Sequence, residues 1–200
     1  MDEVALISSA RSGDLNAFNS LVLTYQDMLY NHAYRMMGEP DYAADATQEA
    51  LISAYKNLHS YRGGSFRAWL LRIVTNACYD ELRRRQRRPT ISLEPVDEEG
   101  DEIESPQWLE DPGDSPEDSL ERAELSKAIQ RCIDDLPVDF RSIVVLVDVQ
   151  GMDYSEAAEV ICKPVGTVKS RLARARARLR DCLQAFRELL PGGFRQRLES

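Results

Sequence analysis

The sequence predicts an all-α protein in which two small helical domains are joined by a flexible acidic linker. Apolar residues recur at helical spacing on both sides of a central segment, 89–117, which is rich in proline, glycine, serine and acidic residues and has no sustained period. The run RSIVVLV, 141–147, suits a strand by propensity, but no partner strand is evident, so we expect a buried helix. With 200 residues and 43% hydrophobic content, the chain can form two small cores.

Three helices are expected before the linker. The first keeps helical apolar spacing from Leu21 to Met36 and ends at Gly38. The second covers DYAADATQEALISAYKNL, 41–58, and the third covers SFRAWLLRIVTNACYDELRRRQRR, 65–88, which is closed by a proline. The apolar residues of the third helix that share a core-facing stripe are Phe66, Leu70, Ile73, Val74 and Ala77.

The linker region carries most of the negative charge. The formal net charge of the chain is −9, yet the stretch from Glu94 to Glu124 holds fourteen acidic residues and one basic residue, which leaves a net +4 for the remainder. Such a composition is typical of a segment that is largely disordered when free. The predicted organisation is a domain at 1–88, a linker at 89–117, a domain at 118–190 and a C-terminal tail at 191–200.

The second domain is expected to hold two helices followed by a helix-turn-helix. The two helices, 119–136 and 139–151, are separated by a proline. In DYSEAAEVICKPVGTVKSRL, 153–172, Asp153 or Ser155 is the candidate N-cap of the next helix. Pro164 cannot continue that helix but suits the first turn of a new one. The pattern therefore predicts a helix, a tight turn and a second helix that reads DNA.

The last helix, which begins near Val165, has the pattern of a DNA major-groove reader. One side carries apolar residues at core spacing, and the opposite side carries only the small residues Ser170, Ala173 and Ala177 between two edges of Lys and Arg. A slim face lets the backbone approach the base edges, while flanking cations reach phosphates or guanines. The alternatives are a solvated basic helix and an amphipathic helix for membranes or acidic partners.

A second nucleic-acid surface is expected on the third helix. The residues rotated away from its core stripe, at spacings of four, three and four, are Arg72, Asn76, Tyr79 and Arg83. With Tyr61 and Trp69 nearby, cations and aromatic rings suit single-stranded DNA, where each stacked base contributes about 1–3 kcal/mol. The loop SYRGGSF, 60–66, supplies two glycines that permit close approach to an extruded base. In the alternative interpretation, Phe66 and Trp69 belong to the core and the arginines form a solvated last turn.

The sequence offers little support for an enzyme or a metalloprotein. Two isolated histidines and the absence of HxE…PCxxC, DxD and Walker patterns predict no catalytic site, no metal and no cofactor. The scattered cysteines, without a CxxC pair, are expected to be free thiols of a reducing compartment: Cys78, Cys132, Cys162 and Cys182. No apolar run reaches the ~18 residues of a membrane span, and the N-terminus is not signal-like, so a cytoplasmic protein without membrane insertion is expected.

Two blocks of the sequence resemble a known family. DATQEALISAYKNLHSYRGGSFRAWLLRIVTNACYDELRRRQR, 45–87, resembles region 2 of bacterial sigma factors of the extracytoplasmic function (ECF) group, within the sigma-70 family. LPVDFRSIVVLVDVQGMDYSEAAEVICKPVGTVKSRLARARARL, 136–179, resembles their region 4. The resemblance implies an alternative sigma factor, which directs promoter-specific initiation by core RNA polymerase and has no chemistry of its own.

The resemblance also implies a role for each block. Region 2 would dock on the β′ clamp helices of core polymerase through Asp45, Gln48 and Glu49, and it would melt the −10 element of promoter DNA. Its implied −10 contacts are Tyr61, Phe66, Trp69, Arg72, Asn76, Tyr79 and Arg83. Region 4 would contact the β flap and read the −35 element through Thr167, Lys169, Ser170, Arg171, Arg174 and Arg178. The linker would run toward the RNA exit path, an anti-sigma factor is an expected partner, and the active protein would be associated with the nucleoid.

One other function class explains part of the sequence. A stand-alone helix-turn-helix regulator with an N-terminal ligand or dimerisation domain accounts for 153–180 but gives no role to Arg72 and Asn76. The linker is longer and more acidic than the resemblance implies. Its charge motivates the hypothesis that it covers a basic helix of the free protein by mimicking nucleic acid.

Overall fold

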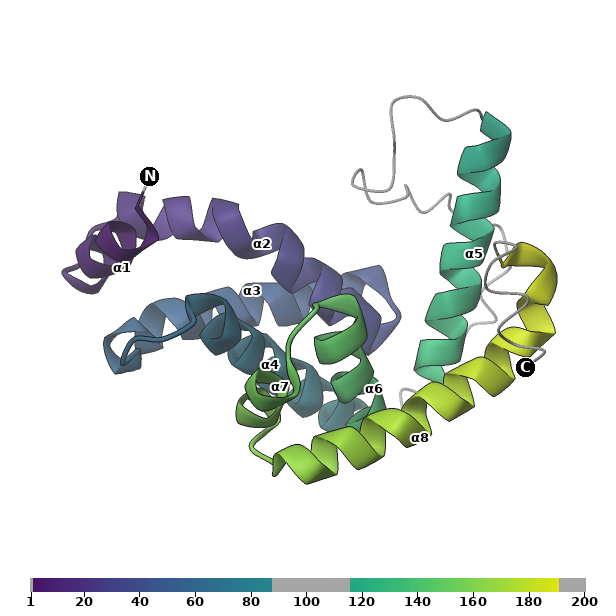
Figure 1. Cartoon of the computed structure of the whole chain (residues 1–200). Helices are drawn as coiled ribbons and strands as arrows, with labels where there is room; N and C mark the ends of the chain where they lie inside the picture. The colour runs from purple at the N-terminus through teal and green to yellow at the C-terminus, as the bar shows by residue number, and fades with distance from the viewer. Residues whose placement is uncertain (1, 88–115, 191–200) are drawn as a thin grey trace.

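The computed structural model describes residues 2–87 and 116–190, and each regular element within these ranges is helical (Figure 1). The predicted all-α class is therefore confirmed. All but the last two residues of the predicted linker, and the whole of the predicted tail, lie outside the described residues.

The first helical unit comprises α1 to α4. Its elements are α1 (Glu3–Arg11), α2 (Leu15–Met37), α3 (Pro40–Asn57), a 3₁₀ turn (Leu58–Ser60) and α4 (Phe66–Arg87). The helices α2, α3 and α4 pack against one another, and α1 packs on α2. The three helices expected from periodicity are thus present and form one small bundle.

The helical structure of this unit begins before Leu21, where the apolar periodicity starts. Asp2 and Asp14 are the N-caps of α1 and α2, and each carboxylate accepts a backbone N–H bond from the first turn of its helix. Ile7 and Ala10 of α1 are buried against the rest of the bundle. The capping aspartates are a sequence signal that could have located both helix starts.

The second helical unit comprises the elements after the linker. They are α5 (Pro116–Asp134), α6 (Val138–Val144), a π-helical turn (Val145–Val149), α7 (Tyr154–Ile161), α8 (Val165–Leu183) and a 3₁₀ segment (Gln184–Leu189). The segment 141–147 is helical, as predicted, and its residues Ile143, Val145 and Leu146 are fully buried. Burial on all sides explains why this helix carries a continuous apolar run instead of a polar face.

The helix-turn-helix has the local geometry that its sequence predicts. Asp153 caps α7 in a reciprocal capping box, in which its carboxylate accepts the Glu156 N–H and the Glu156 carboxylate accepts the Asp153 N–H. Cys162 ends α7 in the left-handed conformation, with φ 52°. Pro164 is the N-cap of α8, so the reading helix begins at Val165 as expected.

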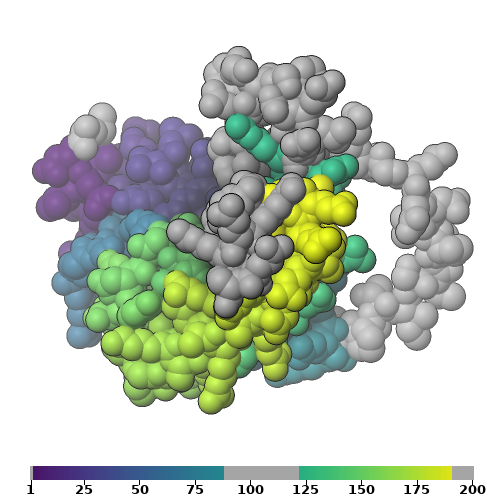
Figure 2. Space-filling view, turned by 45° about the vertical axis from the view of Figure 1, so that its right-hand side comes forward, coloured from purple at the N-terminus to yellow at the C-terminus, as the bar shows by residue number. Residues whose placement is uncertain are grey.

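The two units are in direct contact. Helix α7 packs on α4, and α5 and α6 pack on the C-terminal half of α2. In the space-filling view, α6 to α8 (green to yellow-green) lie against the first unit (purple to blue) (Figure 2). Buried residues of both units belong to one continuous apolar cluster.

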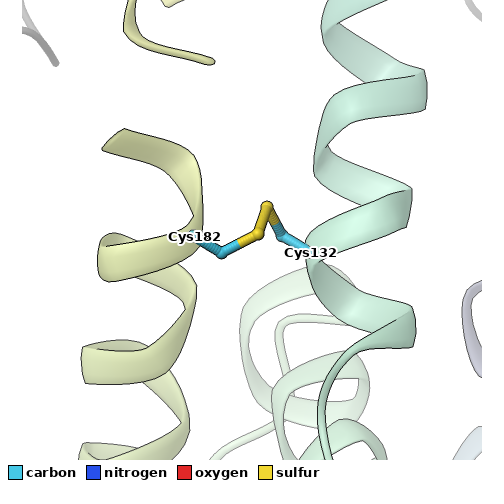
Figure 3. The surroundings of a disulfide bond; sticks show 2 residues. All are labelled: Cys132 and Cys182. Atoms are coloured by element: carbon cyan, nitrogen blue, oxygen red, sulfur yellow. A yellow bond between two sulfur atoms is a disulfide. The ribbon is translucent and has the colours of Figure 1, made fainter. Parts of the chain in front are cut away.

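Cys132 and Cys182 form a disulfide that joins α5 to α8, with a Cα–Cα distance of 5.7 Å (Figure 3). The expectation of four free thiols is therefore wrong for this pair. Fifty residues separate the two cysteines, and only the packing of α5 on α8 brings them together, which no local spacing reveals. Cys78 is a free, buried thiol whose pKa is raised to about 12 by burial, and Cys162 is free and exposed.

Reduction of this disulfide is expected to lower the free energy of unfolding by about 4 kcal/mol, because the bond closes a loop of about fifty residues in the unfolded chain. The measurement is urea unfolding with and without a dithiol reductant, followed by circular dichroism. The double variant Cys132→Ala/Cys182→Ala is the control, and its unfolding midpoint should not respond to the reductant. Equal midpoints of the unmodified protein under the two conditions would contradict the expectation.

His32 is fully buried between α2 and α4. Its Nε2 lies 3.0 Å from the Thr75 hydroxyl, while its Nδ1 has no hydrogen-bond partner among the described residues. Burial, and to a smaller extent the charge of Arg67, lowers the pKa of His32 to about 3. The imidazole is therefore neutral in the folded protein and must acquire its proton in the unfolded chain.

Acid should destabilise the fold through His32. The unfolded imidazole has a pKa of about 6.5, so the stability due to its neutral form is complete above that pH and falls by about 2 kcal/mol at pH ~5. Between pH ~7.5 and ~5, the free energy of unfolding should fall by about 2 kcal/mol less in His32→Gln than in the unmodified protein. The measurement is urea unfolding at the two pH values. His59→Gln, at an exposed position of the same unit, is the control and should behave like the unmodified protein.

Candidate nucleic-acid interface

Helix α8 presents a slim face to solvent because its opposite face is buried. The predicted core stripe consists of Val168, Leu172, Ala175 and Leu179. The first three are at most 2% exposed, whereas Leu179 is half-buried. Ser170 and Ala173 are exposed on the other side. Neither side chain projects far from the backbone, so this face can approach the base edges in a major groove.

The cations on the two edges of this face are held by neighbouring helices. On one edge, Arg171 pairs with Asp139 at 2.7 Å and the guanidinium of Arg178 lies 5.3 Å from the ring centroid of Phe140. On the other edge, Lys169 lies over the ring of Tyr154 at 5.7 Å. Exposed pairs of this kind contribute little to stability, so the side chains can exchange them for phosphates.

Arg176 completes the second edge and pairs with Asp148 at 2.5 Å, a contact that raises the pKa of its guanidinium. Arg174 is exposed and has no ion pair among the described residues, so no carboxylate there competes with DNA for its guanidinium.

Thr167 occupies the first turn of α8 and is half-buried. Its backbone N–H donates to the Pro164 carbonyl at 2.9 Å, so the side-chain hydroxyl, and not this N–H, is the group that could bind a phosphate. The Ser170 hydroxyl donates to the Thr167 carbonyl at 3.1 Å and stays on the exposed face.

A second site is a cavity of about 570 Å³ that lies between the N-terminal half of α4, the loop before it, and α7. Four of the seven expected −10 residues line it together: Tyr61, Trp69, Arg72 and Asn76. Arg72 and Asn76 are exposed and Trp69 is half-buried. The wall therefore combines an aromatic ring, a cation and an amide, which suits a stacked and hydrogen-bonded base.

The loop 62–65 shapes the rim of this cavity. The Tyr61 hydroxyl donates to the Gly64 carbonyl at 2.6 Å, and both Gly63 and Gly64 have φ near +90°. Side chains are strained at such φ values, so the two glycines are needed for this turn. Arg62 also lines the cavity, although the sequence pattern did not single it out.

Phe66 is 2% exposed and does not line the cavity. It stacks on Trp69 at a centroid distance of 5.4 Å and meets the Tyr61 ring edge-on at 5.3 Å. Its burial favours the core interpretation that the sequence left open. Phe66 packs from the core side against the Tyr61 and Trp69 rings that line the cavity.

Tyr79 and Arg83 lie further along α4. The Tyr79 hydroxyl is 2.7 Å from the Ser142 hydroxyl of α6, and burial raises the pKa of Tyr79. Arg83 is exposed, pairs with Asp80 at 3.5 Å, and lines another hollow, of about 580 Å³, together with Arg84 and Arg87. These two residues are therefore separate from the cavity, one contacting the second unit and the other belonging to a basic helix end.

A third surface lies on α3, where Asp45, Gln48 and Glu49 are all exposed as expected. Gln48 borders a groove of about 370 Å³ between α2 and α3, whereas Asp45 and Glu49 lie outside its lining. The sequence analysis missed the apolar part of this groove, Tyr30, Leu51 and Ile52. No local sequence pattern marks it, because the 47% exposure of Ile52 is evident only once α2 and α3 are packed together.

Within the described parts of the chain, no group of three or more His, Cys, Asp or Glu side chains could hold a metal ion. No helix of the described ranges is both long and apolar enough to cross a membrane. The accessible features are thus two basic or aromatic surfaces suited to nucleic acid and one groove suited to a protein.

Comparisons with known proteins agree with this arrangement. The Sigma-70 region 2 family model matches residues 21–88, and the Sigma-70 region 4 model matches residues 126–179. The ECF RNA polymerase sigma factor SigE of Mycolicibacterium smegmatis is 37% identical over 84% of this chain, which spans 62% of that protein. The ECF RNA polymerase sigma factor SigW of Bacillus subtilis is 37% identical over 89% of this chain and 95% of its own length.

A solved structure shares the architecture of both units. The structure of CnrH in complex with the cytosolic domain of CnrY matches with a TM-score of 0.66 and 26% sequence identity, and the match covers 92% of this chain and 97% of that one. Since both family regions match in order and relatives align over most of the sequence, the chain belongs to the ECF sigma factors of the sigma-70 family.

Proposed function

We propose that the protein is an alternative sigma factor, which binds core RNA polymerase and directs promoter-specific transcription initiation. The observation that supports the proposal is that a chain of this family has an exposed small-residue face edged by cations on α8 and a cavity lined by aromatic, cationic and amide side chains beside α4. Recognition and melting of a promoter need both. Neither step makes or breaks a covalent bond, so the protein acts as an initiation factor and not as an enzyme.

The second unit, with domain bounds 118–190, would read the −35 element. Ser170, Arg171 and Arg174, together with Lys169, would face base edges, and Thr167 and Arg178 would bind phosphates. The exposed small-residue face of α8 and the cations along its edges support this assignment. The same unit would contact the β flap of the polymerase.

The first unit, with domain bounds 1–88, would melt the −10 element and hold its non-template strand. Asn76 would read an extruded base within the cavity, with Trp69 and Tyr61 forming the aromatic wall and Arg72 following the backbone. Arg83 would bind phosphates from the basic end of α4. Phe66 supports the site by packing, and Tyr79 becomes available only where α6 does not cover it.

The groove between α2 and α3 would receive the β′ clamp helices. Leu51 and Ile52 offer an apolar floor, and Gln48 with the neighbouring Asp45 and Glu49 offers a polar rim. A partly apolar centre with a polar rim is the usual anatomy of a protein interface.

The remaining assignments follow from the family. The linker, 89–117, would run through the polymerase toward the RNA exit path, an anti-sigma factor would restrain the protein, and the active complex would lie at the nucleoid within the cytoplasm. A stand-alone helix-turn-helix regulator is not favoured, because it gives no role to the cavity beside α4.

The direct test is transcription by bacterial core polymerase on a library of random promoters, with and without the protein. Protein-dependent starts that share two spaced motifs would support the proposal. No such starts, together with tight binding to a palindromic duplex by the protein alone, would support the stand-alone regulator instead.

Two substitutions should separate the two reading sites. Arg174→Ala is expected to relax selection of the upstream motif and Asn76→Ala that of the downstream motif, each by about tenfold, since one base contact contributes roughly 1–3 kcal/mol. Selection is measured by sequencing the transcripts from the library. Arg131→Ala removes an exposed charge from α5 and should change neither motif. Loss of both motifs in either variant would contradict the assignment.

Polymerase binding should depend on the groove. Ile52→Asp places a charge on its apolar floor and is expected to weaken binding to core polymerase by about tenfold or more, as loss of a central interface residue does. Fluorescence anisotropy of the labelled protein gives the dissociation constant. Val4→Asp changes another exposed aliphatic residue, on α1 and outside the groove, and should bind normally. Equal effects of the two variants would exclude the groove as the docking site.

A further inference from the structure

Side chains of the second unit form hydrogen bonds to backbone carbonyls at the C-terminal end of α2. The last carbonyls of a helix have no partner within the helix. Here Gln130 of α5 donates toward the carbonyls of Tyr34 and Arg35, at 3.4 and 3.5 Å, and accepts a bond from the Arg35 guanidinium at 3.0 Å. Gln130 is 5% exposed, so this contact excludes water.

Arg141 of α6 reaches the same helix end. Its guanidinium donates to the Met36 carbonyl at 2.5 Å and also to carbonyls of Asp134 and Leu136 in its own unit. A cation is favoured at a helix C-terminus by the helix dipole. The side chain is nevertheless costly to bury, because its Nε has no partner among the described residues.

Three further hydrogen bonds join the units. The Tyr79 hydroxyl bonds the Ser142 hydroxyl, and the Arg67 guanidinium donates to both the backbone carbonyl and the side-chain Oε1 of Gln150. Ser142 is 1% exposed. The contact between the units thus combines apolar packing with several buried polar groups, a composition typical of contacts that open and close.

Helix α7 covers the single-strand cavity in this arrangement. The cavity that contains Arg72 and Asn76 has Glu156, Glu159 and Val160 of α7 as its opposite wall. A nucleic-acid strand in the cavity would meet these carboxylates, and like charges that face one another across an interface are unfavourable. The reading face of α8 points elsewhere, since Ser170 and Arg174 remain exposed.

We propose that this contact is a self-inhibiting closed form, in which region 4 masks the −10 cavity of region 2 while leaving the −35 helix exposed. The inference rests on the proposed function of the cavity. Opening returns the polar groups of the contact to water and separates the two cavity walls. Binding to polymerase, which engages both regions, supplies the free energy that shifts the population to the open form.

The residue that allows a sharp test is Gly38, the left-handed C-cap of α2 with φ 79°. A Cβ added there would lie 2.6 Å from a carboxylate oxygen of Asp134 on α5. Asn tolerates left-handed φ, so Gly38→Asn preserves the helix end but displaces the Asp134 carboxylate. Since that carboxylate accepts a bond from Gln130 and pairs with Arg141, the substitution should weaken the polar contact between the units. Gly13→Asn is the matched control, because Gly13 has φ +99° and an added Cβ there meets nothing within 4 Å.

The first readout is conformational and needs no DNA. Small-angle X-ray scattering of the full chain is expected to give a larger radius of gyration for Gly38→Asn than for Gly13→Asn and the unmodified protein. Amide hydrogen exchange should rise along α4 and α7, which the contact protects in the closed form. A circular-dichroism melt confirms that the variant is folded.

The second readout is binding to short fluorescein-labelled DNA of random sequence, measured by anisotropy. If the closed form holds about nine-tenths of the population, Gly38→Asn should bind the single-stranded pool about tenfold more tightly than the unmodified protein. Its affinity for the same pool as duplex should be unchanged, because α8 is exposed in both forms. Gly13→Asn should match the unmodified protein in both assays.

The inference is overturned if a folded Gly38→Asn variant matches Gly13→Asn in scattering, exchange and single-strand affinity. Should Gly38→Asn fail to fold, Gln130→Ala replaces it, since it removes only the bonds to the end of α2 and to Asp134 and should open the contact partially. If the variant opens but the protein directs no transcription, the proposed function is rejected and the closed form stands. If the protein directs transcription but the variant does not open, the closed form is rejected and the proposed function stands.

Discussion

Burial of one apolar stripe on each of α4 and α8 is the constraint on which the other features depend. Val168 and Leu172 fix the rotation of α8, and Leu70 and Val74 fix that of α4. Once these stripes are buried, the opposite faces are determined, because successive residues of a helix are about 100° apart. The small-residue face of α8 and the amide-bearing face of α4 are therefore consequences of core packing, and no separate device is needed to orient them.

Local chemistry explains which parts of the fold could be predicted from the sequence. Periodicity placed α3 and α4, and the proline before Val165 placed the start of α8, because each signal acts within one or two turns of its own helix. The same logic covers Asp153, whose capping box is encoded by residues three apart. Asp14 carries an equivalent signal that apolar periodicity alone does not use.

Other features depend on which helices pack together, and local patterns contain no such information. Cys132 and Cys182 were expected to be free thiols and are joined only because α5 lies against α8. The groove around Ile52 exists because α2 and α3 are neighbours. The aromatic residues of α4 illustrate the same limit at the site: Phe66 is buried and Trp69 lines the cavity, although both fit the helical pattern.

The positions of the disulfide and of the hydrogen bonds between the two regions determine how the regions can move relative to each other. The disulfide lies inside region 4, where it holds α5 to α8, and no disulfide links the two regions within the described residues. Arg141 bonds more groups in its own unit than in region 2, so it also stays with region 4 when the contact opens. Region 4 can therefore swing away as one body, with its reading helix unchanged. What the movement alters is access to Asn76. Under the proposed assignments, α8 would be ready to read duplex DNA in the free chain, whereas the proposed −10 cavity would first have to be uncovered.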